Sequence, residues 1–234
     1  MKKILLIALA FSLGTLAYAD TFTTYATRAQ QNPSDIYDWG QFGPFGTPVS
    51  SPAAAMSFNG LGATVSIAGS TMYTAVEDCN PSCGLGNWTG NFEIGENLLY
   101  TGNAAGGGPG PMTIAFASGV SSVGFQIQDE FFGAFTATLQ AYNGSTLLDT
   151  LVMQGVSNQQ TDGSAIFMGL GDLTGPNITK IVISDQGQGD ANDFAINALS
   201  IGISSTTTPE PSSMVLLVTG LLGAMGLARR KLKL

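Results

Sequence analysis

VGFQIQDEFFGAFTATLQAYNGSTLLDTLVM, residues 123–153, decides the fold of this chain. Apolar residues alternate with small or polar residues over 123–127 and again over 135–141. A period of two is typical of a strand with one buried face, so both segments are predicted to be strands. Asn143-Gly144 then precedes another apolar run. Because both residues tolerate positive φ, they predict a hairpin turn.

The rest of residues 20–203 consists of short apolar runs divided by Gly, Pro and Asn, without a convincing amphipathic helix period. Over 194–203 the apolar phase shifts between Ile196 and Leu199, which predicts a bulge or burial on both faces. About ten short strands in about 185 residues predict an all-β passenger domain, a sandwich of two antiparallel sheets. The further strands are expected at 63–67, 72–76, 98–101, 112–117, 147–153 and 178–184.

Charge is unevenly distributed along the chain. Residues 20–203 hold 15 acidic side chains, whereas Arg28 and Lys180 are the basic ones. This excess of negative charge repels phosphate backbones and argues against a nucleic-acid partner. It leaves two interpretations open, solubility alone or attraction of divalent cations.

The N-terminus has the form of an export signal. Two lysines precede an apolar run over 4–16, which ends in Ala17-Tyr18-Ala19. This order is typical of a secretory signal peptide, so residues 1–19 are expected to be removed after Ala19. An N-terminal membrane anchor is the alternative.

The two cysteines fit an exported protein. Cys79 and Cys83 flank a turn-forming Asn-Pro-Ser segment, and an oxidising compartment favours a disulfide between them. A zinc site is disfavoured because the chain contains no histidine to complete the ligand set.

The C-terminus holds a second apolar segment. A linker over 204–211 ends in Pro209-Glu210-Pro211, residues 212–228 carry no charge, and a basic tail follows over 229–234. Seventeen residues of helix span about 25 Å, close to the roughly 30 Å of a hydrocarbon core. The sequence predicts a transmembrane helix whose basic tail, with Arg229, Arg230 and Lys231, stays in the cytoplasm.

Pro-Glu-Pro, an apolar helix and an Arg-Arg-Lys cluster, in this order at the end of an exported chain, resemble the PEP-CTERM sorting tail of Gram-negative bacteria. The resemblance implies recognition by exosortase, a membrane-embedded protease-transpeptidase, with cleavage near Pro209 to Pro211. It implies a transient inner-membrane anchor and delivery to the cell surface or extracellular matrix, often in bacteria that make exopolysaccharide. The ending 193–199 also resembles the jelly-roll modules that such proteins often carry. A plain membrane anchor is the alternative.

Several kinds of catalysis are disfavoured. Without histidine the chain cannot form a Ser-His-Asp or Cys-His site, and it has no phosphate-binding glycine loop followed by lysine. Carboxylate chemistry remains, because glycoside hydrolysis needs two carboxylates across a cleft. Acidic residues lie closest together in the sequence at Glu77-Asp78, at Glu93 with Glu96, and at Asp129-Glu130.

Two binding sites are hypotheses. The loop SDQGQGDAND supplies oxygen ligands for calcium, and its candidates are Asp185, Asp190, Asn192 and Asp193. No other cofactor is indicated. Carbohydrate faces stack on exposed aromatic rings, and the candidates for that contact are Trp39, Trp88 and Tyr142.

The sequence therefore predicts a non-catalytic, exported surface or matrix protein that associates with exopolysaccharide. The alternative is a secreted carbohydrate-active hydrolase that uses paired carboxylates.

Overall fold

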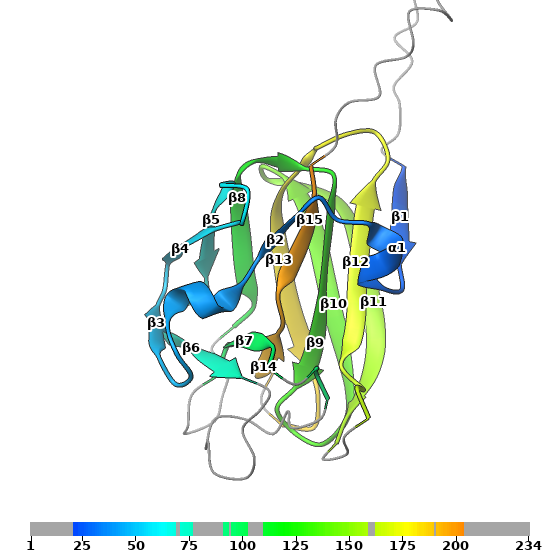
Figure 1. Cartoon of the computed structure of the whole chain (residues 1–234). Coiled ribbons are helices and arrows are strands. Elements are labelled where there is room, and N and C mark those ends of the chain that lie inside the picture. The colour runs from blue at the N-terminus through cyan, green and yellow to red at the C-terminus, as the bar shows by residue number, and fades with distance from the viewer. Residues whose placement is uncertain are drawn as a thin grey trace, which may run out of the picture.

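A computed structural model describes residues 21–68, 71–76, 91–93, 95–102, 110–158, 162–189 and 191–203. Over these residues the chain is almost entirely β, arranged as two antiparallel sheets (Figure 1). The helical elements among them are one-turn segments, α1 (Arg28–Gln31) and the 3-10 helix η1 (Trp39–Phe42). The all-β, two-sheet prediction is confirmed.

The larger sheet has nine strands. Its central strand is β9, which pairs with β12, β14 and β15. The order is β1-β12-β9-β14-β7-β6-β3, and β2 joins through β15. The bounds are β1 (Phe22–Tyr25), β2 (Asp35–Tyr37), β3 (Pro48–Ser50), β6 (Thr71–Val76), β7 (Asn97–Tyr100), β9 (Ser122–Asp129), β12 (Ile166–Asp172), β14 (Phe194–Ile196) and β15 (Leu199–Gly202).

The second sheet has six strands in the order β11-β10-β13-β8-β5-β4. Its longest members are the hairpin strands that the opening stretch predicted, and their inward residues face those of β9 across the core. The bounds are β4 (Ala53–Met56), β5 (Gly62–Ser66), β8 (Met112–Val120), β10 (Gly133–Asn143), β11 (Thr146–Ser157) and β13 (Ile178–Gln186).

The β10–β11 hairpin forms as predicted, but its turn is shifted by one residue. Asn143 pairs with Thr146, so the two turn residues are Gly144 and Ser145. Positive φ occurs at Gly144, at 59°, which is the residue that a type II′ turn needs at its first central position. A bulge after Ala141 adjusts the register next to the turn.

The last predicted strand is divided into two. β14 ends at Ile196 and pairs with β7 and β9, while β15 begins at Leu199 and pairs with β2 and β9. Asn197 and Ala198 form the break, which explains the phase shift in the sequence. This break becomes the centre of a polar network described below.

The core lies between the sheets and uses the predicted alternation. Val123, Phe125 and Ile127 of β9 are fully buried, and so is Leu139 of β10. Burying a side chain of this size stabilises the fold by about 1.5–3 kcal/mol. The alternating pattern of 123–141 therefore determines which face of each sheet turns inward.

The aromatic segment before β3 closes part of the core. Tyr37 and Trp39 are fully buried, and their rings stack at 6.5 Å between centroids. Phe42 stacks on Trp39 at 6.1 Å. The apolar residues of this segment follow neither a helix nor a strand period in the sequence, because the segment is a short strand followed by a 3-10 turn.

Several sequence predictions lie outside the described residues: the signal peptide, the Cys79–Cys83 disulfide, the linker and the C-terminal helix. Among the residues that the structure describes, no helix has the length and apolar character needed to cross a membrane.

Candidate functional site

A shallow surface pocket of about 500 Å³ lies beside η1 and the end of β4. Phe58 is 75% exposed and Met56 is 56% exposed, so an apolar surface borders the pocket. The lining residues are Asp38, Gly40, Gln41, Met56, Phe58 and Asn97.

The loop after β4 holds Phe58 outward. The Ser57 hydroxyl donates to the buried Asp35 carboxylate, and the Phe58 amide donates to the carbonyl of Ile36 at 3.0 Å. Gly60 then turns the chain with φ of 89°, a conformation that favours glycine. The backbone of Phe58 is therefore fixed while its ring faces solvent.

The polar wall of the pocket is also ordered. Asp38 Oδ1 accepts from the Gly40 amide at 2.7 Å and from Asn97 Nδ2 at 2.9 Å. Gln41 Nε2 donates to the Asp38 carbonyl, and its Oε1 accepts from the Met56 amide, both at 2.7 Å. A carboxylate and two amides are thus held next to exposed apolar groups, which suits binding of a neutral polyhydroxyl ligand.

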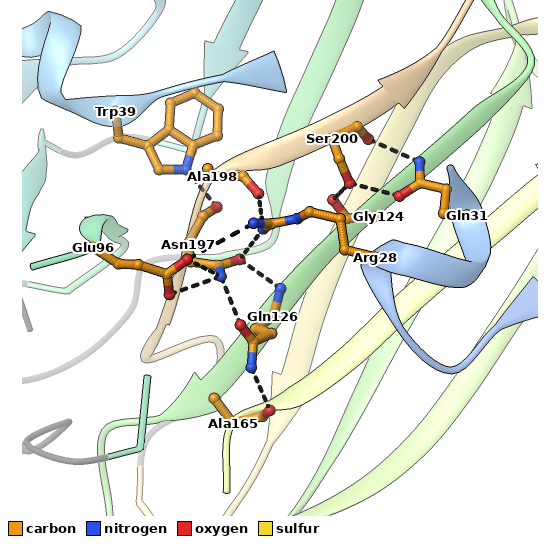
Figure 2. Close-up of polar contacts among 10 residues, drawn as sticks. All are labelled: Arg28, Gln31, Trp39, Glu96, Gly124, Gln126, Ala165, Asn197, Ala198 and Ser200. Atoms are coloured by element: carbon orange, nitrogen blue, oxygen red, sulfur yellow. Dashed lines mark hydrogen bonds and ion pairs between the residues drawn. The ribbon is translucent and has the colours of Figure 1, made fainter. Parts of the chain in front are cut away.

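A network centred on Asn197 lies beneath this region, and Figure 2 shows its contacts. Asn197 Nδ2 donates to both carboxylate oxygens of Glu96 at 3.0 Å and to Gln126 Oε1 at 2.8 Å. Asn197 Oδ1 accepts from the Gln126 amide at 2.7 Å and from Arg28 at 3.2 Å. Arg28 also donates to the Ala198 carbonyl at 2.8 Å and lies 3.8 Å from Glu96.

The network positions the polar wall of the pocket at both Asp38 and Asn97. The Trp39 indole N–H donates to the Asn197 carbonyl at 2.8 Å, which fixes the residue next to Asp38 (Figure 2). Glu96, held by the Asn197 amide, directly precedes Asn97. The break between β14 and β15 therefore holds Trp39 and Glu96, the neighbours in sequence of two pocket residues, in place.

A second contact fastens α1 to the larger sheet. Gln31 Nε2 donates to the Ser200 carbonyl at 3.2 Å, and the Ser200 hydroxyl donates to Gln31 Oε1 at 2.6 Å (Figure 2). Gly124 makes this approach possible, because a Cβ there would lie 2.3 Å from Gln31 Oε1.

Of the three residues predicted to contact carbohydrate, the two that the structure describes, Trp39 and Tyr142, do not line the pocket. Trp39 is 0% exposed, so its assignment to a stacking surface is wrong; its ring packs in the core and its N–H is bonded within the network. Trp88 lies outside the described residues. Tyr142 is half-buried on β10, with Lys180 Nζ 4.3 Å from its ring centroid and its hydroxyl bonded to Gln140.

Among the residues that the structure describes, the dense acidic places do not form a cleft with paired carboxylates. Asp129 is fully buried and faces the buried Asp185, and Glu96 is held in the Asn197 network. Glu77 and Asp78 lie outside the described residues. Of the carboxylates described here, Asp38 is the one that lines the pocket.

The predicted calcium loop is only partly described. Asp185 and Asp193 are buried, Asn192 has a left-handed φ of 64°, and Asp190 lies outside the described residues. Within the described ranges, no group of three or more His, Cys, Asp or Glu side chains is arranged to hold a metal ion.

Comparisons with known proteins address the tail directly. The family model of the PEP-CTERM protein-sorting motif matches residues 207–231. This confirms the sorting tail and marks the chain as an exported protein handled by exosortase in a Gram-negative bacterium. No curated protein matches the chain.

Solved structures with a similar arrangement of strands include a DUF4465 family protein from Bacteroides caccae. It is 13% identical with a TM-score of 0.42, and the match covers 77% of this chain and 99% of that one. Another is TmCBM61 in complex with β-1,4-galactotriose, 14% identical with a TM-score of 0.32, where the match covers 61% of this chain and 88% of that one.

Proposed function

We propose that the mature protein is a non-catalytic component of the cell surface or extracellular matrix that contacts exopolysaccharide through the pocket beside Phe58. The observation that carries the proposal is the exposed Phe58 ring beside the ordered carboxylate and amide of Asp38 and Asn97. An apolar ring next to fixed hydrogen-bonding groups matches the alternating C–H and hydroxyl surface of a sugar.

The negative charge of residues 20–203 limits the class of polysaccharide that the pocket can bind. Residues 20–203 hold 15 acidic and two basic side chains, and Asp38 adds negative charge within the pocket. Like charge repels uronic-acid and sulfated polymers, especially at low ionic strength. The pocket therefore favours neutral polysaccharides. Tyr142 on the six-stranded sheet and Trp88 remain further candidate contacts.

The route to the surface follows from the two ends of the chain. The signal peptide is removed after Ala19, the helix 212–228 holds the protein transiently in the inner membrane, and the basic tail stays in the cytoplasm. Exosortase then cleaves near Pro209–Pro211. The jelly-roll arrangement and the Cys79–Cys83 disulfide belong to the same proposal.

Binding is tested with purified protein on arrays of neutral and acidic polysaccharides. We expect wild-type protein to bind neutral polymers, and Phe58→Ala to bind them at least about tenfold more weakly, a loss of about 1.4 kcal/mol. Leu173→Ala is the matched control, because Leu173 is 64% exposed on another part of the surface. Equal binding by Phe58→Ala and wild type contradicts the pocket assignment.

A reducing-sugar assay on every bound polymer separates binding from hydrolysis. We expect no turnover. Turnover that disappears when one carboxylate is replaced would instead establish the alternative, a hydrolase with paired carboxylates.

A further inference from the structure

Two acidic side chains meet at one end of the core. Asp129 ends β9 in the nine-stranded sheet, and Asp185 lies near the end of β13 in the six-stranded sheet. Asp129 is 0% exposed and Asp185 is 4% exposed, and their carboxyl groups are in hydrogen-bonding contact. Two ionised carboxylates in this position need a positive partner, because burial without one is costly.

The described residues do not supply that partner. The basic residues between positions 20 and 203 are Arg28 and Lys180. Arg28 is bonded to Asn197 and lies next to Glu96, and Lys180 lies over the Tyr142 ring. Neutralisation must therefore come from a bound cation or from a proton.

The oxygens at this place also lack donors. Asp129 Oδ1 accepts from the Phe131 amide at 2.6 Å. Asp129 Oδ2, both Asp185 oxygens and Asn192 Oδ1 are buried and accept no hydrogen bond from an N–H or hydroxyl donor among the described residues. The contact between the two carboxyl groups is a hydrogen bond only when one of them carries a proton. Native proteins rarely leave buried polar atoms unsatisfied, so four at one place indicate a ligand that binds oxygen.

The surrounding loop backbone approaches the carboxyl pair closely. The Asn192 amide donates to the Asp185 carbonyl at 3.1 Å, and its left-handed φ of 64° keeps the residue beside the pair. A Cβ on Gly187 would lie 2.1 Å from Asp129 Oδ2, so glycine allows the loop backbone to lie directly against this oxygen. Asp193 is excluded from the set because its carboxylate is hydrogen-bonded to the Tyr100 hydroxyl.

We propose that Asp129, Asp185 and Asn192 bind one calcium ion that joins the ends of the two sheets. The two carboxylates and the amide supply the four unsatisfied oxygens, and carbonyls or water complete the six to eight that calcium takes. Soft metals are disfavoured by the absence of nitrogen and sulfur ligands, and magnesium by its need for a near-ideal octahedron. Relative to the sequence hypothesis, the ligand set gains Asp129 from a different strand.

The test compares the melting temperature of the purified full chain in EGTA and in calcium. At a calcium concentration about 100 times the dissociation constant, we expect the melting temperature to rise by about 5–10 °C. Isothermal titration calorimetry with calcium chloride measures the binding directly. Magnesium at the same concentration is expected to give a much smaller rise.

The variants Asp129→Asn and Asp185→Asn are expected to lose the calcium response while melting no lower than wild type in EGTA. Each removes a buried charge without changing the side-chain size. Asp149→Asn on β11 is the matched control and keeps the full response, because Asp149 lies at the other end of the hairpin. No calorimetric binding and an unchanged wild-type melting temperature would show that a proton neutralises the pair. Such a result, or an equal response in Asp185→Asn, overturns the proposal.

Discussion

At the scale of single residues, Asn197 has the largest number of hydrogen-bond partners in the region of the pocket. Its amide serves Glu96, Gln126 and Arg28, and its carbonyl accepts from Trp39. Truncation leaves several buried polar groups without partners, and each such group costs about 1–3 kcal/mol.

We therefore expect Asn197→Ala to lower the free energy of unfolding by about 2–4 kcal/mol. Urea unfolding followed by tryptophan fluorescence measures this, since Trp39 reports directly on the network. Asn59→Ala, which removes one exposed hydrogen bond to Ser34, is the control and is expected to change stability by about 0.5 kcal/mol or less. Similar losses in the two variants would disprove a central role for Asn197.

Gly124 provides a second test at this scale. In Gly124→Ala the new methyl group meets Gln31 and the Phe167 ring at 2.3 and 2.6 Å, so we expect α1 to detach from the sheet. Limited trypsin digestion detects this as faster cleavage after Arg28, the first basic residue after Lys3. Gly62→Ala on β5 is the control, because a Cβ there meets Ala117 Cβ at 3.7 Å, an ordinary contact, and β5 belongs to the other sheet. Unchanged cleavage after Arg28 in Gly124→Ala would contradict the packing argument.

The buried carboxyl pair gives calcium-free protein a definite pH dependence. Burial, and then the neighbouring Asp129, raise the pKa of Asp185 from 3.8 to about 9, and Asp193 acts in the same direction. Because the folded pKa exceeds the unfolded one, ionisation penalises the folded state. We expect the free energy of unfolding in EGTA to fall as pH rises from about 4 towards 9. Asp185→Asn should flatten this dependence, and an unchanged slope in that variant would contradict the assignment.

Single residues also show where sequence reasoning stops. Tryptophan is the usual stacking residue, yet Trp39 is buried and Phe58 is exposed. The signal for Phe58 was its place directly before Asn59-Gly60, since a large apolar residue at a tight turn often faces solvent. The calcium prediction did not include Asp129. Its contact with Asp185 depends on how the two sheets stack, which the sequence alone does not show.

At the scale of elements, the β10–β11 hairpin carries the clearest division between buried and exposed faces. Leu139 is fully buried whereas the adjacent Thr138 is on the outer face. We expect Leu139→Ala to cost about 2–5 kcal/mol and Thr138→Ala to change stability by about 0.5 kcal/mol or less. Thermal unfolding of the two variants measures the difference. Equal effects would mean that the strand is not packed against β9 as described.

The same division explains which elements the sequence could predict. Long strands such as β9, β10 and β13 repeat the period-two pattern often enough to be recognised. Strands of three or four residues, such as β2 and β3, hold too few positions, and long-range pairing defines them. β12 was missed because glycines at 169 and 171 replace its outward side chains, where Tyr25 of β1 packs.

At the scale of the whole molecule, the sorting tail determines where the protein resides. Replacing Pro209-Glu210-Pro211 with three alanines removes the motif that the family model matches within 207–231. We expect the variant to accumulate in the inner-membrane fraction at the size of the uncleaved chain, as judged by cell fractionation and intact mass. Replacing Ser204-Ser205-Thr206 with alanines is the control for linker composition. Normal processing of the first variant would show that cleavage does not depend on this motif.

The two described ends of the chain leave from one end of the sandwich. Thr21 accepts from Leu173, and Gly202 accepts from Ser121, so residues 21 and 203 lie where β9 begins, and Asp129 lies where it finishes (Figure 1). The proposed calcium site and residue 203, from which the chain continues towards the sorting tail, therefore lie at opposite ends of the sandwich.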